Sequence, residues 1–252
     1  ISIHYGIKTG LDKVFVIDED IKNKLIKEDA KCKEIIKPIL RGRNINKYGY
    51  NFKNIYLLHT GFDLDVSREY LSVYNYLLKF KDKLVKRSDK GKNWWNLRAC
   101  AYYNKFEAEK IAWIELADEG RFALVKKGTY TLAGTFILSG DNLRYILAFL
   151  NSTLSTWYFN YISTNSGMGT NMWKKYKIEL LPIPELNKDN DSKINKIEDL
   201  VDKILTITSL NNYKENVEKL KQIKHIQESI DNLVYEFYGL DEKDRSIIEK
   251  GD

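Results

Sequence analysis

The sequence predicts a mixed α+β fold: a mixed-sheet domain followed by an antiparallel helical pair. Before residue 185, short apolar runs alternate with turn-forming residues, and Gly and aromatic residues occur throughout. After residue 193 there is no Trp or Pro, and apolar residues recur at helical spacing. The intervening run, LPIPELNKDNDS at 181–192, holds two of the three prolines and has the composition of a linker. We therefore expect domains at 1–184 and 194–252, joined by residues 185–193.

In the first part, short apolar runs bounded by Gly, Asn or charged residues predict strands. The expected strands are 13–17, 55–58, 111–116, 122–125, 135–138 and 178–181. Two segments have helical spacing instead. Residues 21–36 are expected to contain a short helix, and residues 143–162 have the length and apolar spacing of a longer one. Several strands with few helices indicate a mixed α+β domain.

In the second part, apolar residues recur at helical spacing over 194–210 and again over 217–237, which predicts two antiparallel helices. Gly239 suits the position just after a helix end, and Asp241 suits the N-cap of a short terminal helix that ends near Lys250. The apolar stripe is narrow, as in helices that pack against one partner. Packing within this chain and a role as a spacer or docking element both fit this pattern.

Composition bounds the class of protein. A chain of 252 residues with 43% hydrophobic residues can bury a full core. Neither a run of 18 apolar residues nor a secretory signal is visible, and the first residue is not Met, which suggests an excised domain. Cys32 and Cys100 fit no metal or redox spacing, so we expect reduced thiols in a cytoplasm. The three histidines are scattered and form no ligand pair, so we expect no zinc site and no metal ligands.

Motifs for catalysis are absent from the sequence. There is no Pro-Pro dipeptide, and therefore no Asn/Asp-Pro-Pro-aromatic motif of amino-methyltransferases. The only Gly-x-Gly, at 167–169, follows a helical segment instead of opening one. The chain has no P-loop, no Gly-x-Ser-x-Gly, and neither Pro-Asp nor Glu-x-Lys of a metal-dependent nuclease. We expect no catalytic residue and no enzymatic activity of this chain by itself.

Positive charge is concentrated in one segment. Residues 79–98 carry eight Lys and Arg against two Asp, and they include Trp94 and Trp95. Basic groups interleaved with aromatic residues favour nucleic-acid binding, and a turn-like composition around Gly91 places charges on a loop. A solvated helix face with two core tryptophans is the alternative. The candidates for phosphate contact or scaffold here are Lys86, Arg87, Ser88, Lys90, Lys92 and Arg98.

Three shorter runs have chemistry suited to DNA. Residues 6–10 place Lys8 and Thr9 between glycines, where a backbone amide can approach phosphate, although a bare turn is the alternative. Residues 41–44 follow an apolar run, with a solubilising surface turn as the alternative. Residues 163–175 form a polar loop, with a plain connection as the alternative. Arg binds guanine bidentately and Asn binds adenine, so both segments supply possible base contacts. These candidates are Arg41, Arg43, Asn44, Asn165, Asn171, Lys174 and Lys175.

Taken in order, these blocks resemble a known family. Gly6-x-x-Thr9-Gly10 with KVFVI, IIKPILRGRNI, the long block YNYLLKFKDKLVKRSDKGKNWWNLRACAYYNKFEAEKIAW, and then YILAFLNSTLSTWYF with LLPIP are similar to the TaqI-like specificity domain at the C-terminus of type IIG restriction-modification enzymes. The resemblance spans roughly residues 1–184, and the LNS…LPIP part also recurs in type I specificity subunits. The tail, with IEDLVDKIL and IDNLVYEFYGLDEKDRSIIE, resembles the helical C-terminus of such proteins.

The resemblance implies that residues 1–184 are a DNA target-recognition domain. In this family one polypeptide also carries a nuclease and an adenine-N6 methyltransferase, so S-adenosylmethionine and Mg²⁺ are implied for modules absent from this chain. The implied partners are double-stranded DNA and those N-terminal modules, with no membrane. Because the basic block is the shared one, we expect it to hold phosphate or build the scaffold, with Trp94 and Trp95 packed and specificity in the 41–44 and 163–175 loops.

A protein-interaction module is the alternative function. In that case the helices over 194–238 dock a methyltransferase subunit or a second copy, and the basic segment is only a solvated face.

Overall fold

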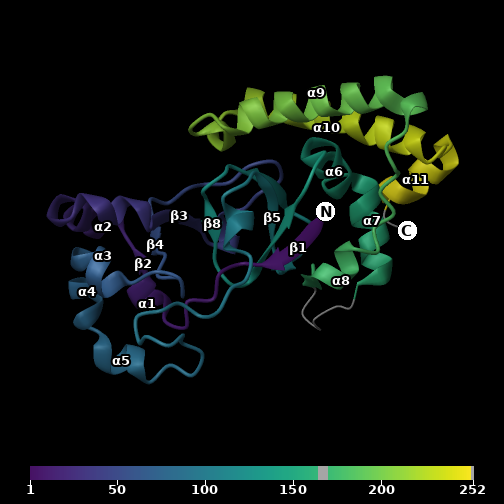
Figure 1. The fold of residues 1–252 in the computed structure, drawn as a ribbon. Helices are drawn as coiled ribbons and strands as arrows, with labels where there is room; N and C mark the ends of the chain where they lie inside the picture. The colour runs from purple at the N-terminus through teal and green to yellow at the C-terminus, as the bar shows by residue number, and fades with distance from the viewer. Residues whose placement is uncertain (164–169, 251–252) are drawn as a thin grey trace.

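The computed structural model describes residues 1–163 and 170–250. Two four-stranded sheets form its centre, with the orders β2-β4-β3-β8 and β1-β9-β5-β7, and a short pair β10-β6 lies beside them (Figure 1). β3 and β8 are parallel and the other paired strands are antiparallel, so the predicted mixed α+β class is confirmed. The strands are β1 (Ser2–Tyr5), β2 (Val16–Ile17), β3 (Ile36–Leu40), β4 (Tyr56–Leu58), β5 (Lys110–Ile114), β6 (Leu116–Ala117), β7 (Phe122–Val125), β8 (Tyr130–Thr131), β9 (Thr135–Ser139) and β10 (Asn171–Met172).

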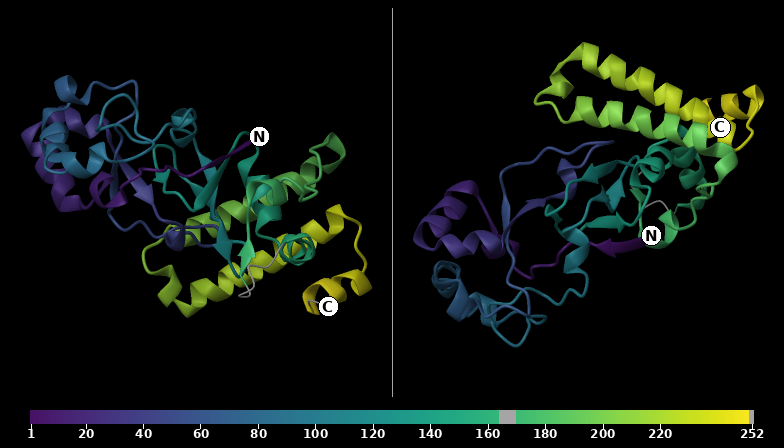
Figure 2. Two further views of the ribbon diagram at one scale, coloured as in Figure 1. Left: turned by 90° about the horizontal axis from the view of Figure 1, so that it is seen from below. Right: turned by 45° about the horizontal axis from the view of Figure 1, so that its top comes forward.

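The helices form two groups at opposite ends of the sheets (Figures 1 and 2). At one end, around the first sheet, are α1 (Asp12–Phe15), α2 (Glu19–Glu28), α3 (Val66–Glu69), α4 (Leu71–Leu78) and α5 (Lys81–Val85). At the other are α6 (Leu143–Leu150), α7 (Thr153–Ile162), α8 (Lys175–Ile178), α9 (Asp191–Thr208), α10 (Val217–Phe237) and α11 (Glu242–Lys250). Each group shares one hydrophobic cluster with its sheet. None of the helices in the described ranges is both long and apolar enough to cross a membrane.

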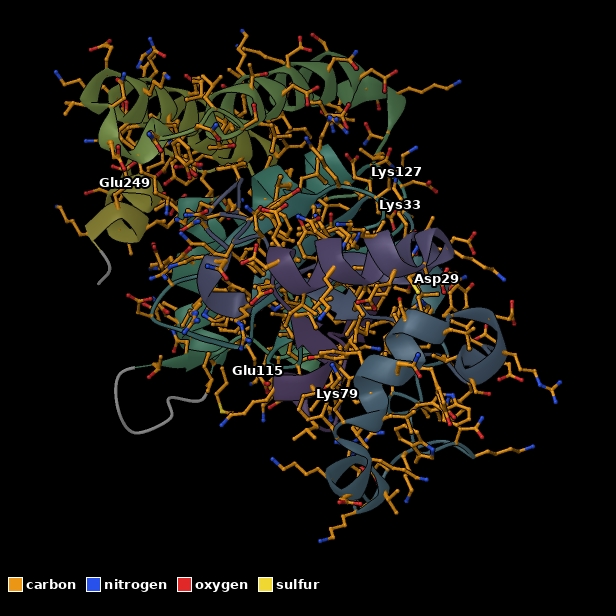
Figure 3. All side chains as sticks on the ribbon, turned by 90° about the vertical axis from the view of Figure 1, so that its left-hand side faces the viewer. Asp29, Lys33, Lys79, Glu115, Lys127 and Glu249 are labelled. Carbon is orange, nitrogen blue, oxygen red and sulfur yellow. The ribbon has the colours of Figure 1, made fainter. Side chains whose placement is uncertain are left out.

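The first group presents a strongly charged exterior. Seen from this end, Lys33 and Lys79 project outward from the α2 and α4 region, and both are exposed (Figure 3). The buried apolar residues of α1 to α5 pack with the strands of the first sheet in the first hydrophobic cluster.

One chain segment belongs to both sheets. Tyr130 and Thr131 pair with Ile39 and Leu40 in the first sheet, and Thr135 to Ser139 pair with β1 and β5 in the second. The turn between them is closed by Thr135, whose buried Oγ1 lies 2.7 Å from the Leu132 carbonyl oxygen. Gly6 packs against this turn so closely that an added Cβ would lie 2.2 Å from the Leu132 oxygen. The turn therefore fixes the position of one sheet relative to the other.

The predicted helical pair packs on the body of the chain. Ile197, Val201 and Ile204 on α9 are fully buried, as are Ile230 and Val234 on α10. They share a hydrophobic cluster with α6, of which seven residues are buried. This chain itself thus covers the middle of the narrow apolar stripe, whereas Leu210, Val217 and Leu220, at the turn between the two helices, are exposed.

A buried polar network joins α10 to the start of α7. The Asp231 carboxylate accepts hydrogen bonds from the Thr153 amide at 2.8 Å and the Thr153 hydroxyl at 2.9 Å. Gln227 donates to the same carboxylate at 3.2 Å and accepts from the Tyr48 hydroxyl at 2.7 Å. Burial raises the pKa of Asp231, and these donors oppose that rise. The network ties the helical pair to residues on both sides of the expected domain boundary.

Most of the predicted elements are present. The strands at 55–58, 122–125 and 135–138 match β4, β7 and β9, and residues 111–116 contain all of β5 except Lys110, together with the start of β6. The helix expected within 21–36 is α2, displaced toward the N-terminus, and α9 begins at Asp191. Gly239 follows α10 with φ 64°, and the Asp241 side chain accepts from the Asp244 amide as an N-cap does.

The strand predicted at 13–17 is wrong for its first three residues. Residues Asp12–Phe15 form α1, and only Val16–Ile17 pair with β4. The amides of Val14 and Phe15 both donate to the Leu11 carbonyl. Consecutive residues of a strand face opposite sides, whereas this turn buries both Val14 and Phe15 in the first cluster.

The single helix predicted over 143–162 is two helices. Asn151 interrupts it, because its side chain accepts from the Phe122 amide at 3.1 Å and donates to the Phe122 carbonyl at 2.9 Å. Ser152 then caps α7 by accepting from the Ser155 amide at 3.1 Å. The apolar spacing placed Asn151 inside a helix, but its side chain is instead hydrogen-bonded to the backbone of β7.

The strand predicted at 178–181 is also wrong. Ile178 ends α8, and the amides of Leu180 and Leu181 donate to the carbonyls of Lys177 and Ile178. This turn places Leu181 in the second cluster directly before Pro182. Burial of two apolar residues, rather than strand pairing, explains the apolar run.

We predict that Asp231→Ala lowers the free energy of unfolding by about 2 to 3 kcal/mol at neutral pH, because three buried donors lose their acceptor. Asp231→Asn should cost about 1 kcal/mol or less, since its carbonyl oxygen still accepts from the Thr153 amide and no buried charge remains. Chemical denaturation of both variants measures the difference. Equal destabilisation by the two substitutions would show that the hydrogen bonds do not hold the helical pair.

Candidate nucleic-acid interface

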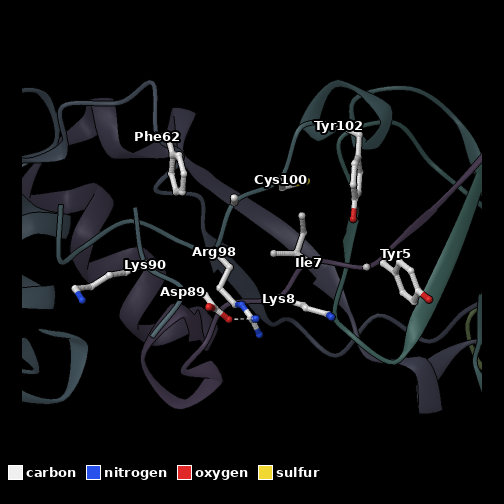
Figure 4. A pocket seen from close by; sticks show the side chains of 11 residues that line it. Tyr5, Ile7, Lys8, Phe62, Asp89, Lys90, Arg98, Cys100 and Tyr102 are labelled. Atoms are coloured by element: carbon white, nitrogen blue, oxygen red, sulfur yellow. Dashed lines mark hydrogen bonds and ion pairs between the residues drawn. The ribbon is translucent and has the colours of Figure 1, made fainter. Parts of the chain in front are cut away.

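A hollow of about 560 Å³ opens where three distant segments meet. Tyr5 and Lys8 line it from the end of β1, Phe62 from the loop after β4, and residues 89–102 from the loop after α5 (Figure 4). Two of the runs singled out in the sequence, 6–10 and 79–98, therefore meet at one place.

Positive charge predominates in this hollow. Lys8, Lys90 and Arg98 line it together with one carboxylate, that of Asp89, which is ion-paired with Arg98. Lys90 Nζ donates to the Arg87 carbonyl at 3.1 Å, and Lys8 Nζ lies 5.6 Å from the centre of the Tyr5 ring. Neither lysine is in an ion pair with any carboxylate of the described ranges. The hollow thus keeps a surplus of two positive charges for an anionic partner.

Arg87 holds the loop that forms one wall. Its guanidinium donates to the carbonyls of Thr9 at 2.8 Å, Trp94 at 2.8 Å and Asn96 at 2.7 Å, and Nε donates to Leu84 at 3.2 Å. Burial lowers the pKa of Arg87 to about 10. With its donors occupied, Arg87 supports the hollow without facing it.

Thr9 also has a scaffold position. Its side chain is buried, is hydrogen-bonded to the Asp12 carboxylate and accepts from the Leu11 amide at 3.1 Å. Lys86, Ser88 and Lys92 are exposed on the turn that follows α5. These three remain free to approach a DNA backbone outside the hollow.

The two tryptophans are packed. Trp95 is 9% exposed and belongs to the first hydrophobic cluster, and Trp94 packs against that cluster. Their rings meet edge to face at 5.4 Å, and both contact the Tyr74 ring. The structure therefore uses these rings to build the core beneath the basic loop.

The 41–44 loop leaves the first sheet close to Lys8. Residues 131–132 have a parallel neighbour on each side: Leu40 of β3 pairs with Thr131, and Ile7 pairs with Leu132. Because both neighbours run in the same direction, the next residues, Arg41 and Lys8, leave the sheet at the same edge. Two strand spacings, roughly 10 Å, separate their backbones. Arg41 is half-buried, Arg43 is exposed, and the Asn44 amide donates to the Arg41 carbonyl in a tight turn.

The described part of the 163–175 run, residue 163 and residues 170–175, lies elsewhere, beside α7 and β6. Asn171 is 6% exposed, donates to Asn160 at 2.8 Å and lies 2.9 Å from the Ser163 hydroxyl, so its amide is already occupied. Lys174 is half-buried ahead of α8, and Lys175 pairs with Glu179 at 3.7 Å. Asn165 lies outside the described residues.

Sequence reasoning missed the aromatic side of the hollow. Tyr5 is 46% exposed and Phe62 is 52% exposed, and the half-buried Tyr102 also lines the hollow. Burial raises the pKa of Tyr102 to about 12, so its hydroxyl stays protonated at neutral pH. No periodic sequence pattern distinguishes Tyr5, Phe62 and Tyr102 from core aromatic residues. The one signal in the sequence was the position of Phe62 directly after Gly61, because an aromatic residue in a turn is often exposed.

Comparison with known families decides the relationship. A family model described as the TaqI-like C-terminal specificity domain matches residues 37–183, more than half of the chain. The chain belongs to this family. The matched range of the specificity domain includes the 41–44 loop and the whole basic segment.

Solved structures show the same fold. A structure of the type IIL restriction-modification enzyme MmeI in complex with DNA matches 95% of the chain at 16% identity, with a TM-score of 0.70. The type IIG restriction endonuclease BpuSI matches 93% of it at 16% identity, with a TM-score of 0.52. The chain covers 33% and 30% of those proteins, so it spans about a third of their length. A comparison with curated proteins finds no match.

We predict that Arg87→Ala lowers the free energy of unfolding by roughly 2 to 4 kcal/mol, because four carbonyls lose a charged donor. Lys86→Ala, next to it and exposed, is the matched control and should change stability by less than about 0.5 kcal/mol. Arg87→Lys should recover only part of the loss, since an ammonium cannot reproduce the planar fork. Thermal and chemical unfolding of the three variants measure this order; similar values for Arg87→Ala and Lys86→Ala would contradict it.

Proposed function

We propose that this specificity domain recognises a specific sequence in double-stranded DNA as one part of a longer restriction-modification polypeptide. The family match over residues 37–183 supports the class of function, and the basic hollow with two unpaired lysines is the observation that carries the DNA contact. In this proposal the domain positions DNA for adenine-N6 methylation and cleavage by modules outside this chain. S-adenosylmethionine and Mg²⁺ belong to those modules, and the location is cytoplasmic.

Within this function, residues 1–184 contact DNA and residues 194–252 brace them. The buried network around Asp231 and the apolar contacts between α9, α10 and α6 support a bracing role. The same contacts argue against a docking module, because the middle of the apolar stripe, with Ile197, Ile204 and Val234, is buried within this chain. Only Leu210, Val217 and Leu220, at the turn between α9 and α10, are exposed apolar residues of the stripe in the described ranges.

The phosphate contacts are assigned to the hollow and its rim. Lys8, Lys90 and Arg98 gather there, and the exposed Lys86 and Lys92 extend the positive surface along the loop. Backbone phosphates attract such a surface regardless of base sequence, and displacement of condensed counterions makes binding depend on salt.

Within the proposal, base contacts are assigned to the 41–44 loop, which lies next to the positive surface. Arg41 and Arg43 project from the turn after β3, at the sheet edge that also carries Lys8. A duplex whose backbone is held by the hollow then has a groove within reach of two guanidiniums, which suit guanine. Lys174 and Lys175 are further candidates on a separate loop.

We predict that the triple substitution of Lys8, Lys90 and Arg98 by alanine weakens duplex binding and flattens its salt dependence. Each lost phosphate contact should lower the slope of log K against log salt by about 0.9. Fluorescence anisotropy of a labelled duplex across a salt series measures both quantities. Lys243→Ala, an exposed lysine on α11, is the control and should change neither; an unchanged slope in the triple variant would refute the phosphate assignment.

We predict that Arg43→Ala relaxes sequence preference while leaving the salt slope nearly unchanged. Loss of a bidentate contact to guanine costs about 1 to 3 kcal/mol at the base concerned and little elsewhere. Selection of duplexes from a randomised pool by the wild-type chain and by the variant reveals the change. Identical enriched sequences would exclude Arg43 from base reading.

A further inference from the structure

The hollow contains more than a phosphate site needs. Cations alone hold the backbone of a duplex, yet this hollow also has the exposed rings of Tyr5 and Phe62 and the partly buried ring of Tyr102. In a duplex the faces of the bases are covered by their neighbours in the stack. Rings beside cations are instead characteristic of sites for unstacked nucleotides, where bases lie on aromatic side chains and the backbone follows positive charge.

The rings are held in place. Tyr102 stacks on His4 with ring centres 4.5 Å apart, so one of its faces is fixed against the β1 strand. Phe62 lies over Gly91, where an added Cβ would be 2.6 Å from the ring and 2.7 Å from the Asn96 side-chain oxygen. Gly91 therefore leaves room for Phe62 to lie flat over the basic loop. Rings fixed in this way lose little conformational freedom on binding.

The cations lie between the rings. Figure 4 shows Phe62 at one end of the hollow and Tyr102 with Tyr5 at the other, while Lys8 and Arg98 lie between them. The hollow, at about 560 Å³, is within the range of small-molecule sites, roughly 300 to 1,000 Å³. It therefore has room for more than a phosphate group.

We propose that this hollow binds an unstacked nucleotide of a DNA strand, with its phosphate on Lys8, Lys90 and Arg98 and its base against the Phe62 or Tyr102 ring. The proposal rests on the proposed DNA function and specifies the state of the strand bound at this place. A single strand, or a nucleotide displaced from the duplex, occupies the hollow, while the continuous duplex lies on the surrounding surface.

The chain contains its own reporter for this site. Cys100 lines the hollow, whereas the only other cysteine, Cys32, is fully buried. Burial raises the pKa of Cys100, so its reaction with a thiol reagent is slow and easily followed at mildly alkaline pH. A nucleotide in the hollow should slow this reaction further.

The experiment compares the protection of Cys100 by a short single strand, by the blunt duplex of the same sequence and by inorganic phosphate. We expect the single strand to protect Cys100 at about tenfold lower concentration than the duplex. Stacking of one base on an aromatic ring supplies enough binding free energy for this difference. Phe62→Ala should remove that preference and Phe62→Trp should keep it. Leu71→Ala, an apolar residue of similar exposure at 55% on α4, should have no effect.

Three results separate this proposal from the proposed function. Equal protection by single strand and duplex, unchanged by Phe62→Ala, overturns the nucleotide site and leaves DNA binding in place. If anisotropy shows that the duplex binds but neither DNA form protects Cys100, the nucleotide site is overturned and the DNA contact lies outside the hollow. Absence of binding to every DNA form overturns both.

Discussion

The turn between β8 and β9 is the constraint on which the rest of this structure depends. Its flanking residues pair in different sheets, so the hydrogen bond of Thr135 to the Leu132 carbonyl and the close packing of Gly6 determine how the two sheets meet. Ile7 pairs with Leu132 and Leu40 with Thr131, and the two segments that carry Lys8 and Arg41 therefore emerge at the same edge, on either side of residues 131–132. The proposed phosphate and base contacts become parts of one surface through backbone pairing rather than through proximity in sequence.

Arg87 extends the same arrangement to the basic loop. The Arg87 guanidinium donates to carbonyls of the 6–10 run, of α5 and of the segment around Trp94, so it joins three pieces of chain. The partial burial of its charge has a free-energy cost that opposes this arrangement. That cost is offset by good geometry at four acceptors. The surrounding lysines are then left unpaired, and the loop can be both a rigid scaffold and an anion-binding surface.

The helical pair completes the molecule from the opposite side. Its apolar stripe covers α6, and the carboxylate of Asp231 provides acceptors at the start of α7. A polar network inside an otherwise apolar interface fixes the register of α10, because a shift by one turn would leave these donors without partners. The pair is thus held against α6 and the start of α7 by both apolar and polar contacts.

The sequence by itself determined the fold class, the helical pair with its Gly239 and Asp241 end signals, four of the strands and the basic segment, because hydrophobic periodicity and local charge are properties of neighbouring residues. It misjudged 13–17, 143–162 and 178–181, where apolar runs are shaped by burial and by the contact of Asn151 with Phe122. Only the tertiary structure decided which cations face the hollow. Arg87 and Lys90 look alike in sequence, yet distant carbonyls occupy the donors of Arg87, and long-range pairing brings Lys8 and the aromatic rings to Lys90.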